Sequence, residues 1–177
     1  MLDFKEAVRK KQVLLDNLRA LDSLIVAFSG GVDSTFLLAV AHEALGRKVL
    51  AVTAHSIIYP PGEIEEALAF ARDLGVEHVL LASEASHLPE FVANPPERCY
   101  FCKKYLFEQL RKIAEPRGIR SIAHAANMDD FDDFRPGWKA AVEMGGIAPL
   151  VDARLTKEEI RCLSREMGLA TWNKPSM

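Results

Sequence analysis

A seven-residue turn between an apolar run and a helical pattern limits most strongly what this chain can fold into. Leu24–Ala27 is short and apolar, as a buried strand is, and Thr35–Ala41 has the composition of a packed helix. Between them stands Phe-Ser-Gly-Gly-Val-Asp-Ser, residues 28–34. Two adjacent glycines let the backbone approach a ligand closely, and the first N–H groups of a helix have no partner inside it. This order of strand, tight turn and helix N-terminus predicts an anion site.

The polar side chains of the turn favour a nucleotide over a bare phosphate. Ser29 and Ser34 add hydroxyl donors, whereas Asp33 would repel a phosphate unless a divalent cation lay between them. No lysine follows the glycines as a Walker loop requires, and the three spaced glycines of the dinucleotide fingerprint are missing. The alternative is a Gly-Gly turn with incidental serines, which the position between strand and helix disfavours.

Strand-like and helix-like segments alternate along the chain after an amphipathic helix at residues 3–20. We expect strands at about 24–28, 48–53, 77–81, 119–124 and 147–150, and helices at about 34–45, 63–74, 97–115 and from Thr156 onward. The alternation predicts an α/β fold: a Rossmann-like, doubly wound sheet of five parallel strands with helices on both faces. Ligands of such sheets bind beyond the carboxyl ends of the strands. Thr156 and Glu159 have the spacing of a capping box.

The bulk properties narrow the class of protein. A chain of 177 residues is most simply one domain, and a net charge of −3 argues against a nucleic-acid partner. The N-terminus has no apolar signal core, and no apolar run is long enough to cross a membrane. Three cysteines, an odd number, without an export signal indicate reduced thiols and a cytoplasmic location.

The segment Ser-Gly-Gly-x-Asp-Ser resembles the PP-loop of the ATP pyrophosphatase (adenine nucleotide alpha hydrolase-like) superfamily. Its members include ammonia-using NAD and GMP synthetases, asparagine synthetase and several thiolases; they cleave ATP between the α and β phosphates. The blocks Arg98-Cys-x-x-Cys-Lys103 and Arg135-Pro-Gly137 together are similar to the LarE family of ATP-dependent sacrificial sulfur transferases. This resemblance runs from about residue 4 to residue 177 and treats the chain as a single PP-loop ATP-binding domain.

The resemblance implies ATP and Mg²⁺ as cofactors and a small-molecule carboxylate, nucleotide-like, as substrate. Asp33 would hold Mg²⁺ and, with Asp130, act in catalysis, while Arg135 would contact a phosphate or carboxylate. A surface arginine and a solvated acidic loop (Asp129, Asp130, Asp132, Asp133) are the alternatives. The residues expected to bind the nucleotide are Ala27, Phe28, Ser29, Gly30, Gly31, Val32, Asp33, Ser34, Thr53, Ala54, Ser56 and Asn127.

Cys99 and Cys102 form a Cys-x-x-Cys at the expected start of a helix, where a thiolate would be stabilised. Three interpretations stay open: thiol chemistry on the substrate, half of a metal site, or packing without a role. A zinc site would need Cys162 together with His87 or His124. His124, at a strand end, is equally compatible with a buried histidine and a site residue.

The sequence departs from the LarE pattern in two places. LarE proteins continue from the Lys-Pro at residues 174–175 into a segment with the sacrificial cysteine and a further domain, whereas this sequence stops at Met177. Ala125-Ala-Asn127 replaces the usual Gly-Thr-Asn, which removes a backbone approach and a hydroxyl contact. We therefore expect an adenylating enzyme of the sulfur-transferase type, with an ammonia-using synthetase or a non-catalytic ATP-binding module as alternatives. A homo-oligomer is compatible with all three.

Overall fold

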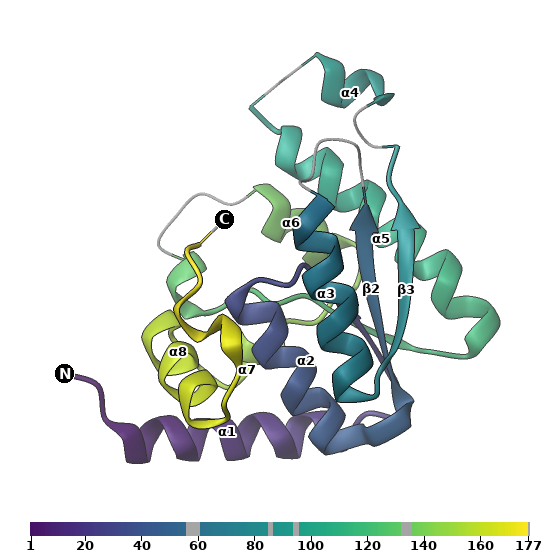
Figure 1. Cartoon of the computed structure of the whole chain (residues 1–177). Helices are drawn as coiled ribbons and strands as arrows, with labels where there is room; N and C mark the ends of the chain where they lie inside the picture. The colour runs from purple at the N-terminus through teal and green to yellow at the C-terminus, as the bar shows by residue number, and fades with distance from the viewer. Residues whose placement is uncertain (56–60, 85–86, 94–95, 132–135, 177) are drawn as a thin grey trace.

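The computed structural model describes residues 1–55, 61–84, 87–93, 96–131 and 136–176 (Figure 1). Its strands are β1 (Leu24–Ala27), β2 (Val49–His55), β3 (Glu77–Ala82) and β4 (Ser121–Ala123). The α-helices are α1 (Phe4–Arg19), α2 (Val32–Leu45), α3 (Pro61–Leu74), α4 (Pro89–Val92), α5 (Arg98–Arg117), α6 (Pro136–Glu143), α7 (Pro149–Asp152) and α8 (Lys157–Glu166).

The sheet is parallel, with the strand order β3-β2-β1-β4. Leu24 at the start of β1 is in register with Val49 of β2 on one side and with Ser121 of β4 on the other. The chain thus builds outward from β1 to β3 and then crosses back to the other side of β1. The switch point lies between β1 and β4, and the prediction of a doubly wound α/β fold is confirmed.

The predicted fifth strand at 147–150 is wrong, because the sheet of the described residues has four strands. Ile147 makes a single parallel bridge to Ala123, donating its N–H to the carbonyl of Ile122. Pro149 then begins α7. A proline has no N–H for a ladder and its fixed φ suits the first helical position, so the chain turns into a helix after one bridge.

Alternate residues of β1 face two different cores. Leu24 and Val26 pack with buried residues of α1, α2, α3, α7 and α8, whereas Ile25 packs with Phe107 and Leu110 of α5. Helices therefore cover both faces of the sheet (Figure 1), which explains why β1 and β2 read as continuous apolar runs.

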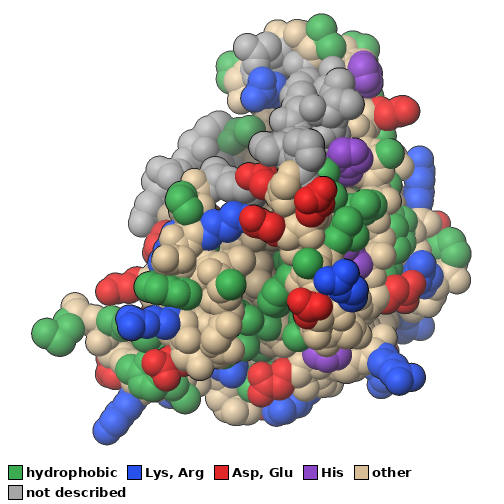
Figure 2. Space-filling view, in the orientation of Figure 1, with side chains coloured by type: hydrophobic (Ala, Val, Ile, Leu, Met, Phe, Trp, Pro, Cys, Tyr) green, Lys and Arg blue, Asp and Glu red, His purple; other side chains and the backbone are tan. Residues whose placement is uncertain are grey.

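The face seen in Figure 2 carries acidic and basic side chains interspersed with apolar ones, without a large patch of charge of one sign. In the described part of the chain, each helix falls short of the length and apolar character needed to span a bilayer.

The predicted capping box begins α8. The hydroxyl of Thr156 accepts from the N–H of Glu159 at 3.2 Å, and the Glu159 carboxylate accepts from the N–H of Thr156 at 2.9 Å. Glu159 is also paired with Lys10 of α1 at 2.8 Å, so the cap is joined to the first helix. The start of α8 is consequently held by the two hydrogen bonds of the cap and by the ion pair with α1.

Replacing Thr156 by Ala should lower the free energy of unfolding by about 1 kcal/mol, because one N–H of the first turn loses its acceptor. Urea unfolding followed by circular dichroism measures this change. Thr156→Ser keeps the hydroxyl and should stay near the parent stability. Equal losses in the two variants would mean that the cap contributes nothing.

Candidate functional site

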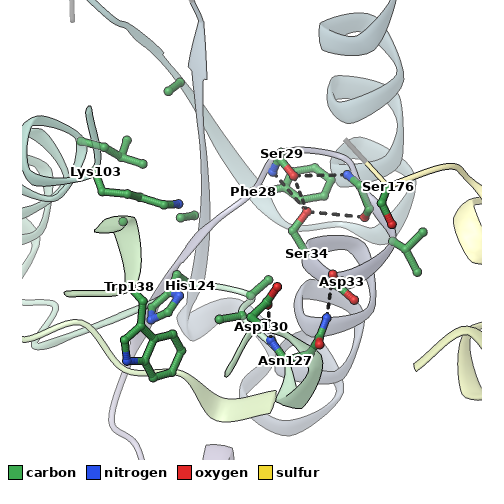
Figure 3. Close-up of a pocket in the computed structure, with 18 of the residues that line it drawn as sticks. Phe28, Ser29, Asp33, Ser34, Lys103, His124, Asn127, Asp130, Trp138 and Ser176 are labelled. Carbon is green, nitrogen blue, oxygen red and sulfur yellow. Dashed lines mark hydrogen bonds between the residues drawn. The ribbon is translucent and has the colours of Figure 1, made fainter. Parts of the chain in front are cut away.

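A cavity of about 800 Å³ opens at the carboxyl edge of the sheet (Figure 3). Residues of β2 and residues that follow β1 and β4 line it, together with residues of α2, α3, α5, α6 and α8 and with Pro175 and Ser176. Its volume lies in the range typical of small-molecule sites, roughly 300–1,000 Å³. It stands where a doubly wound sheet binds its ligands, next to the switch between β1 and β4.

The turn after β1 delivers the N-terminus of α2 to this cavity. Gly30 has a φ of +82°, and a Cβ there would also lie 3.5 Å from that of Ala67 on α3. Gly31 is the N-cap, and its carbonyl accepts the first helical bond, from the N–H of Thr35. The N–H groups of residues 32–34 precede that ladder and belong to the positive end of the helix.

The two serine hydroxyls of the turn hold its shape. Ser29 Oγ lies 3.0 Å from Ser34 Oγ and accepts from the N–H of Gly31 at 3.3 Å, and Ser34 Oγ accepts from the N–H of Ser29. Both serines line the cavity as well. In this structure the two hydroxyls hydrogen-bond to each other and to backbone N–H groups of the loop, and so hold its conformation.

Asp33, in the first turn of α2, is held by two residues from distant parts of the chain. Its Oδ2 accepts from Lys157 Nζ at 2.5 Å and from Asn127 Nδ2 at 3.2 Å. Its Oδ1 is buried and, among the described residues, has no hydrogen-bond partner. Burial raises the pKa of this carboxyl, while the bond and charge of Lys157 act in the opposite direction.

Asp129 and Asp130, which follow β4, orient the two partners of Asp33 through backbone N–H groups. The Asp130 carboxylate accepts from the N–H of Asn127 at 2.8 Å, and Asn127 Oδ1 accepts from the N–H of Asp129 at 2.8 Å. The Asp129 carboxylate in turn accepts from the N–H of Lys157 at 3.1 Å. Asp129 and Asp130 therefore position Asn127 and Lys157 around Asp33, while both also line the cavity.

The donor set around Asp33 fits a magnesium ion bound together with phosphates. Among the described residues, no group of three or more His, Cys, Asp or Glu side chains is arranged to hold a metal by itself. Mg²⁺ is commonly held by one or two carboxylates plus substrate phosphates, so such a cluster is not required. The unpartnered, buried Oδ1 of Asp33 is the oxygen that a cation would satisfy.

The residues of β1, β2 and the positions after them that were predicted to bind the nucleotide are held largely by internal contacts. Thr53 Oγ1 donates to the carbonyl of Phe28 at 2.7 Å and lies 2.7 Å from His78 Nε2. The Phe28 ring packs against Phe70 and His78. Ala27 and Ala54 also line the cavity, and Ser56 lies outside the described residues. The Thr53 hydroxyl thus joins β1 to β2 instead of pointing freely at a ligand.

The opposite wall carries residues that the sequence did not single out for the nucleotide. Figure 3 shows Lys103, His124 and Trp138 across the cavity from the serines. The His124 ring meets Trp138 edge-on at 5.1 Å and Phe107 at 6.1 Å. Burial, with Lys103 nearby, lowers the pKa of His124 to about 4, and burial also lowers the pKa of Lys103. This wall therefore consists of aromatic rings and one amine, that of Lys103, which is shielded from water.

The two cysteines of the Cys-x-x-Cys have different surroundings. Cys99 is exposed and lines the cavity one helical turn before Lys103, whereas Cys102 is half-buried and does not line it. Burial raises the pKa of Cys102, contrary to the thiolate stabilisation expected at a helix start. All three cysteines are free thiols. Of the pair, Cys99 has the access needed for chemistry.

The structure brings most of the predicted residues to one cavity. Every described residue predicted for the nucleotide lines it except Gly30, whose carbonyl accepts from Lys174 Nζ at 3.4 Å. Arg135 lies outside the described residues. Sequence reasoning missed Lys157, Lys103 and Trp138. The only local signal for Lys157 is a basic residue in the first turn of a helix, where the dipole disfavours it.

Comparison with known proteins agrees with this geometry. A family model described as NAD synthase matches residues 7–87. An uncharacterized protein of Synechocystis is 41% identical over 166 residues, covering 92% of this chain and 62% of that protein. Pyridinium-3,5-bisthiocarboxylic acid mononucleotide synthase of Lactiplantibacillus plantarum is 35% identical over 166 residues, covering 93% and 60%. An NH3-dependent NAD synthetase from Campylobacter jejuni has the same fold, with a TM-score of 0.69, 18% identity and coverage of 96% and 75%.

Fold, loop and relatives together resemble those of PP-loop proteins. The predicted resemblance is confirmed: the chain matches an NAD synthase family model over part of its length, and its homologues include a LarE-type mononucleotide synthase. It spans 60–62% of the length of the two curated relatives described above.

Burial of neutral His124 predicts an acid-sensitive fold. Its pKa is about 4 in the folded chain and near 6.5 when unfolded, so the unfolded chain binds the proton first as the pH falls. Stability should fall from about pH 6.5 toward pH 4, by up to roughly 3 kcal/mol from this group.

Urea unfolding at pH 7, 6 and 5 measures the effect. His124→Phe, which keeps an aromatic ring against Trp138, should show a shallower loss than the parent. His87→Gln, at an exposed position, should follow the parent. Parallel curves for the parent and His124→Phe would rule out this role for His124.

Proposed function

We propose that this chain binds ATP with Mg²⁺ in the cavity and uses it to adenylate a small, nucleotide-like carboxylate, releasing pyrophosphate. One observation carries the proposal: the N-terminus of α2 opens into the cavity beside the Asp33 carboxylate, whose buried Oδ1 has no hydrogen-bond partner among the described residues. An anion-binding helix end next to a cation-binding oxygen suits a metal–polyphosphate ligand better than either partner alone.

The phosphates would lie on the backbone N–H groups of residues 31–34, with Lys157 and Lys174 as flanking cations. Lys157 Nζ already lies beside Asp33, and Lys174 Nζ contacts the Gly30 carbonyl and Glu66. Asp33 would hold Mg²⁺ through its free Oδ1. When bound, the ion would neutralise charge on the phosphate oxygens.

The acceptor would enter along the wall of Lys103, His124 and Trp138. A carboxylate oxygen attacks the α-phosphorus, the bond from that phosphorus to the α–β bridging oxygen breaks, and pyrophosphate leaves with the electron pair. The reaction needs no protein nucleophile, so catalysis comes from holding the two reactants in line and from stabilising charge. Lys103 supplies the one cation on the acceptor side among the described residues that line the cavity.

Sulfur transfer is the finer proposal for the step that follows. The Cys99 thiolate would attack the acyl carbon, AMP would leave with the electron pair, and loss of the Cα proton with cleavage of the Cβ–Sγ bond would release the thiocarboxylate and leave dehydroalanine at position 99. It is supported by the similarity to the mononucleotide synthase and by the access of Cys99 to the cavity. The second candidate is an ammonia-using synthetase, favoured by the fold shared with an NH3-dependent NAD synthetase. In that case ammonia would attack the acyl adenylate, and no thiol would take part.

Phosphorus NMR of the chain with Mg·ATP and a pyridine mononucleotide carboxylate tests the first step. AMP and pyrophosphate are expected, and Asp33→Asn should reduce their formation by at least about 100-fold because the carboxylate oxygens for the cation are lost. ADP and phosphate would contradict the proposal. ATP that binds without reacting would instead indicate a non-catalytic nucleotide-binding module.

Single replacements of the two cysteines test the second step. Cys99→Ser should abolish the thiocarboxylate product, detected by mass spectrometry, while AMP formation continues. Cys102→Ser is the matched control and should retain most sulfur transfer, since its side chain does not line the cavity. Full sulfur transfer by both variants would exclude these thiols as donors. An amide formed only when ammonia is added would favour the synthetase.

A further inference from the structure

We infer that Lys157 is a built-in counter-ion that keeps a bare divalent cation out of the Asp33 site and releases it when a polyphosphate enters. The inference rests on the proposed function in one respect, namely that the polyphosphate is a nucleotide in the same cavity. It concerns how the site selects a metal–nucleotide complex over free metal.

The two oxygens of the Asp33 carboxylate differ in their contacts. Oδ2 is shared by Lys157 Nζ at 2.5 Å and Asn127 Nδ2 at 3.2 Å, while Oδ1 is buried without a partner among the described residues. The Asp33 and Lys157 side chains are only 18% and 26% exposed. A cation approaching Oδ1 therefore meets a positive charge on the same carboxylate, with little water to screen it.

The backbone of Lys157 is held independently of the contact that its side chain makes with Asp33. The capping box of Thr156 and Glu159 fixes the start of α8, and the Lys157 N–H donates to the Asp129 carboxylate at 3.1 Å. The buried residues Ile160 and Leu163 of α8 pack into the core shared with α1 and α2. The flexible four-carbon stem can thus turn its ammonium to a new acceptor without moving the helix.

A polyphosphate at the N-terminus of α2 would supply that acceptor. Asp33 lies in the first turn of this helix, so phosphate oxygens on its N–H groups would be near both Asp33 and Lys157. Their negative charge would attract the ammonium and would also offset repulsion between it and a divalent cation. Cation and nucleotide then raise each other's affinity, and thermodynamic linkage requires this effect to be reciprocal.

Binding of Mn²⁺, followed by electron paramagnetic resonance in the absence of nucleotide, tests the inference directly. The parent chain should bind Mn²⁺ weakly, and Lys157→Met should bind it on the order of tenfold more tightly, a typical coupling between sites. The double variant Lys157→Met/Asp33→Asn should lose this gain. Lys157→Arg keeps the charge and should bind Mn²⁺ as weakly as the parent.

Lys174→Met is the matched charge control. It removes a cation that contacts the Gly30 carbonyl and Glu66, not Asp33, and should leave Mn²⁺ affinity little changed. The inference is overturned if Lys157→Met binds Mn²⁺ no more tightly than the parent. It is also overturned if the gain persists without the Asp33 carboxylate, or if Lys174→Met and Lys157→Arg show the same gain.

A second arm separates this inference from the proposed function. Calorimetry with α,β-methylene ATP should show a larger effect of Mg²⁺ on nucleotide affinity in the parent than in Lys157→Met, and equal effects would overturn the inference. A parent chain that fails to bind the analogue would contradict the proposed function. The Mn²⁺ experiment still decides whether Lys157 excludes the bare cation, because it contains no nucleotide.

Discussion

The ion pair between Asp33 and Lys157 is the interaction on which the site depends. It joins residues 124 positions apart, one in the first turn of α2 and the other in the first turn of α8. A buried carboxylate without a partner would be costly, and a lysine at a helix N-terminus opposes the dipole. Each residue offsets the unfavourable position of the other, so the starts of α2 and α8 are held together at the cavity.

The two sides of the cavity differ in chemistry because different layers of the fold provide them. The loop after β1 and the starts of α2 and α8 provide N–H groups, the Asp33 carboxylate and Lys157. Across the sheet edge, α5, α6 and the end of β4 provide Lys103, Trp138 and His124. A polyphosphate suits the first side, and a planar anionic acceptor suits the second. Their meeting at the switch point is what a doubly wound sheet makes possible.

Local patterns predicted those parts of the fold that depend on neighbouring residues. Three features were predicted correctly because the residues that cause them are neighbours in the sequence. They are the apolar run Leu24–Ala27, the Gly-Gly turn and the capping box at Thr156. The prediction of a strand at 147–150 failed because the apolar residues of this segment resemble those of a strand, whereas Pro149 starts a helix. Burial alone does not distinguish the two.

The site was less predictable wherever it depends on contacts across the chain. Lys157 pairs with Asp33, which lies 124 positions earlier in the sequence, and no pattern near residue 157 predicts a carboxylate partner. Thr53 lies at the expected edge, but its hydroxyl is taken by the Phe28 carbonyl. Cys102 lies near the start of a helix as predicted, yet burial outweighs the nearby charge of Lys103 and raises the pKa of its thiol.

A crystal structure with Mg²⁺ and α,β-methylene ATP tests the central claim most directly. Phosphates should lie on the N–H groups of residues 31–34, a cation should lie on Asp33 Oδ1, and Lys157 Nζ should have moved from Asp33 to a phosphate oxygen. A nucleotide bound away from the loop after β1 would contradict the claim. So would a bound nucleotide beside an unchanged Asp33–Lys157 pair.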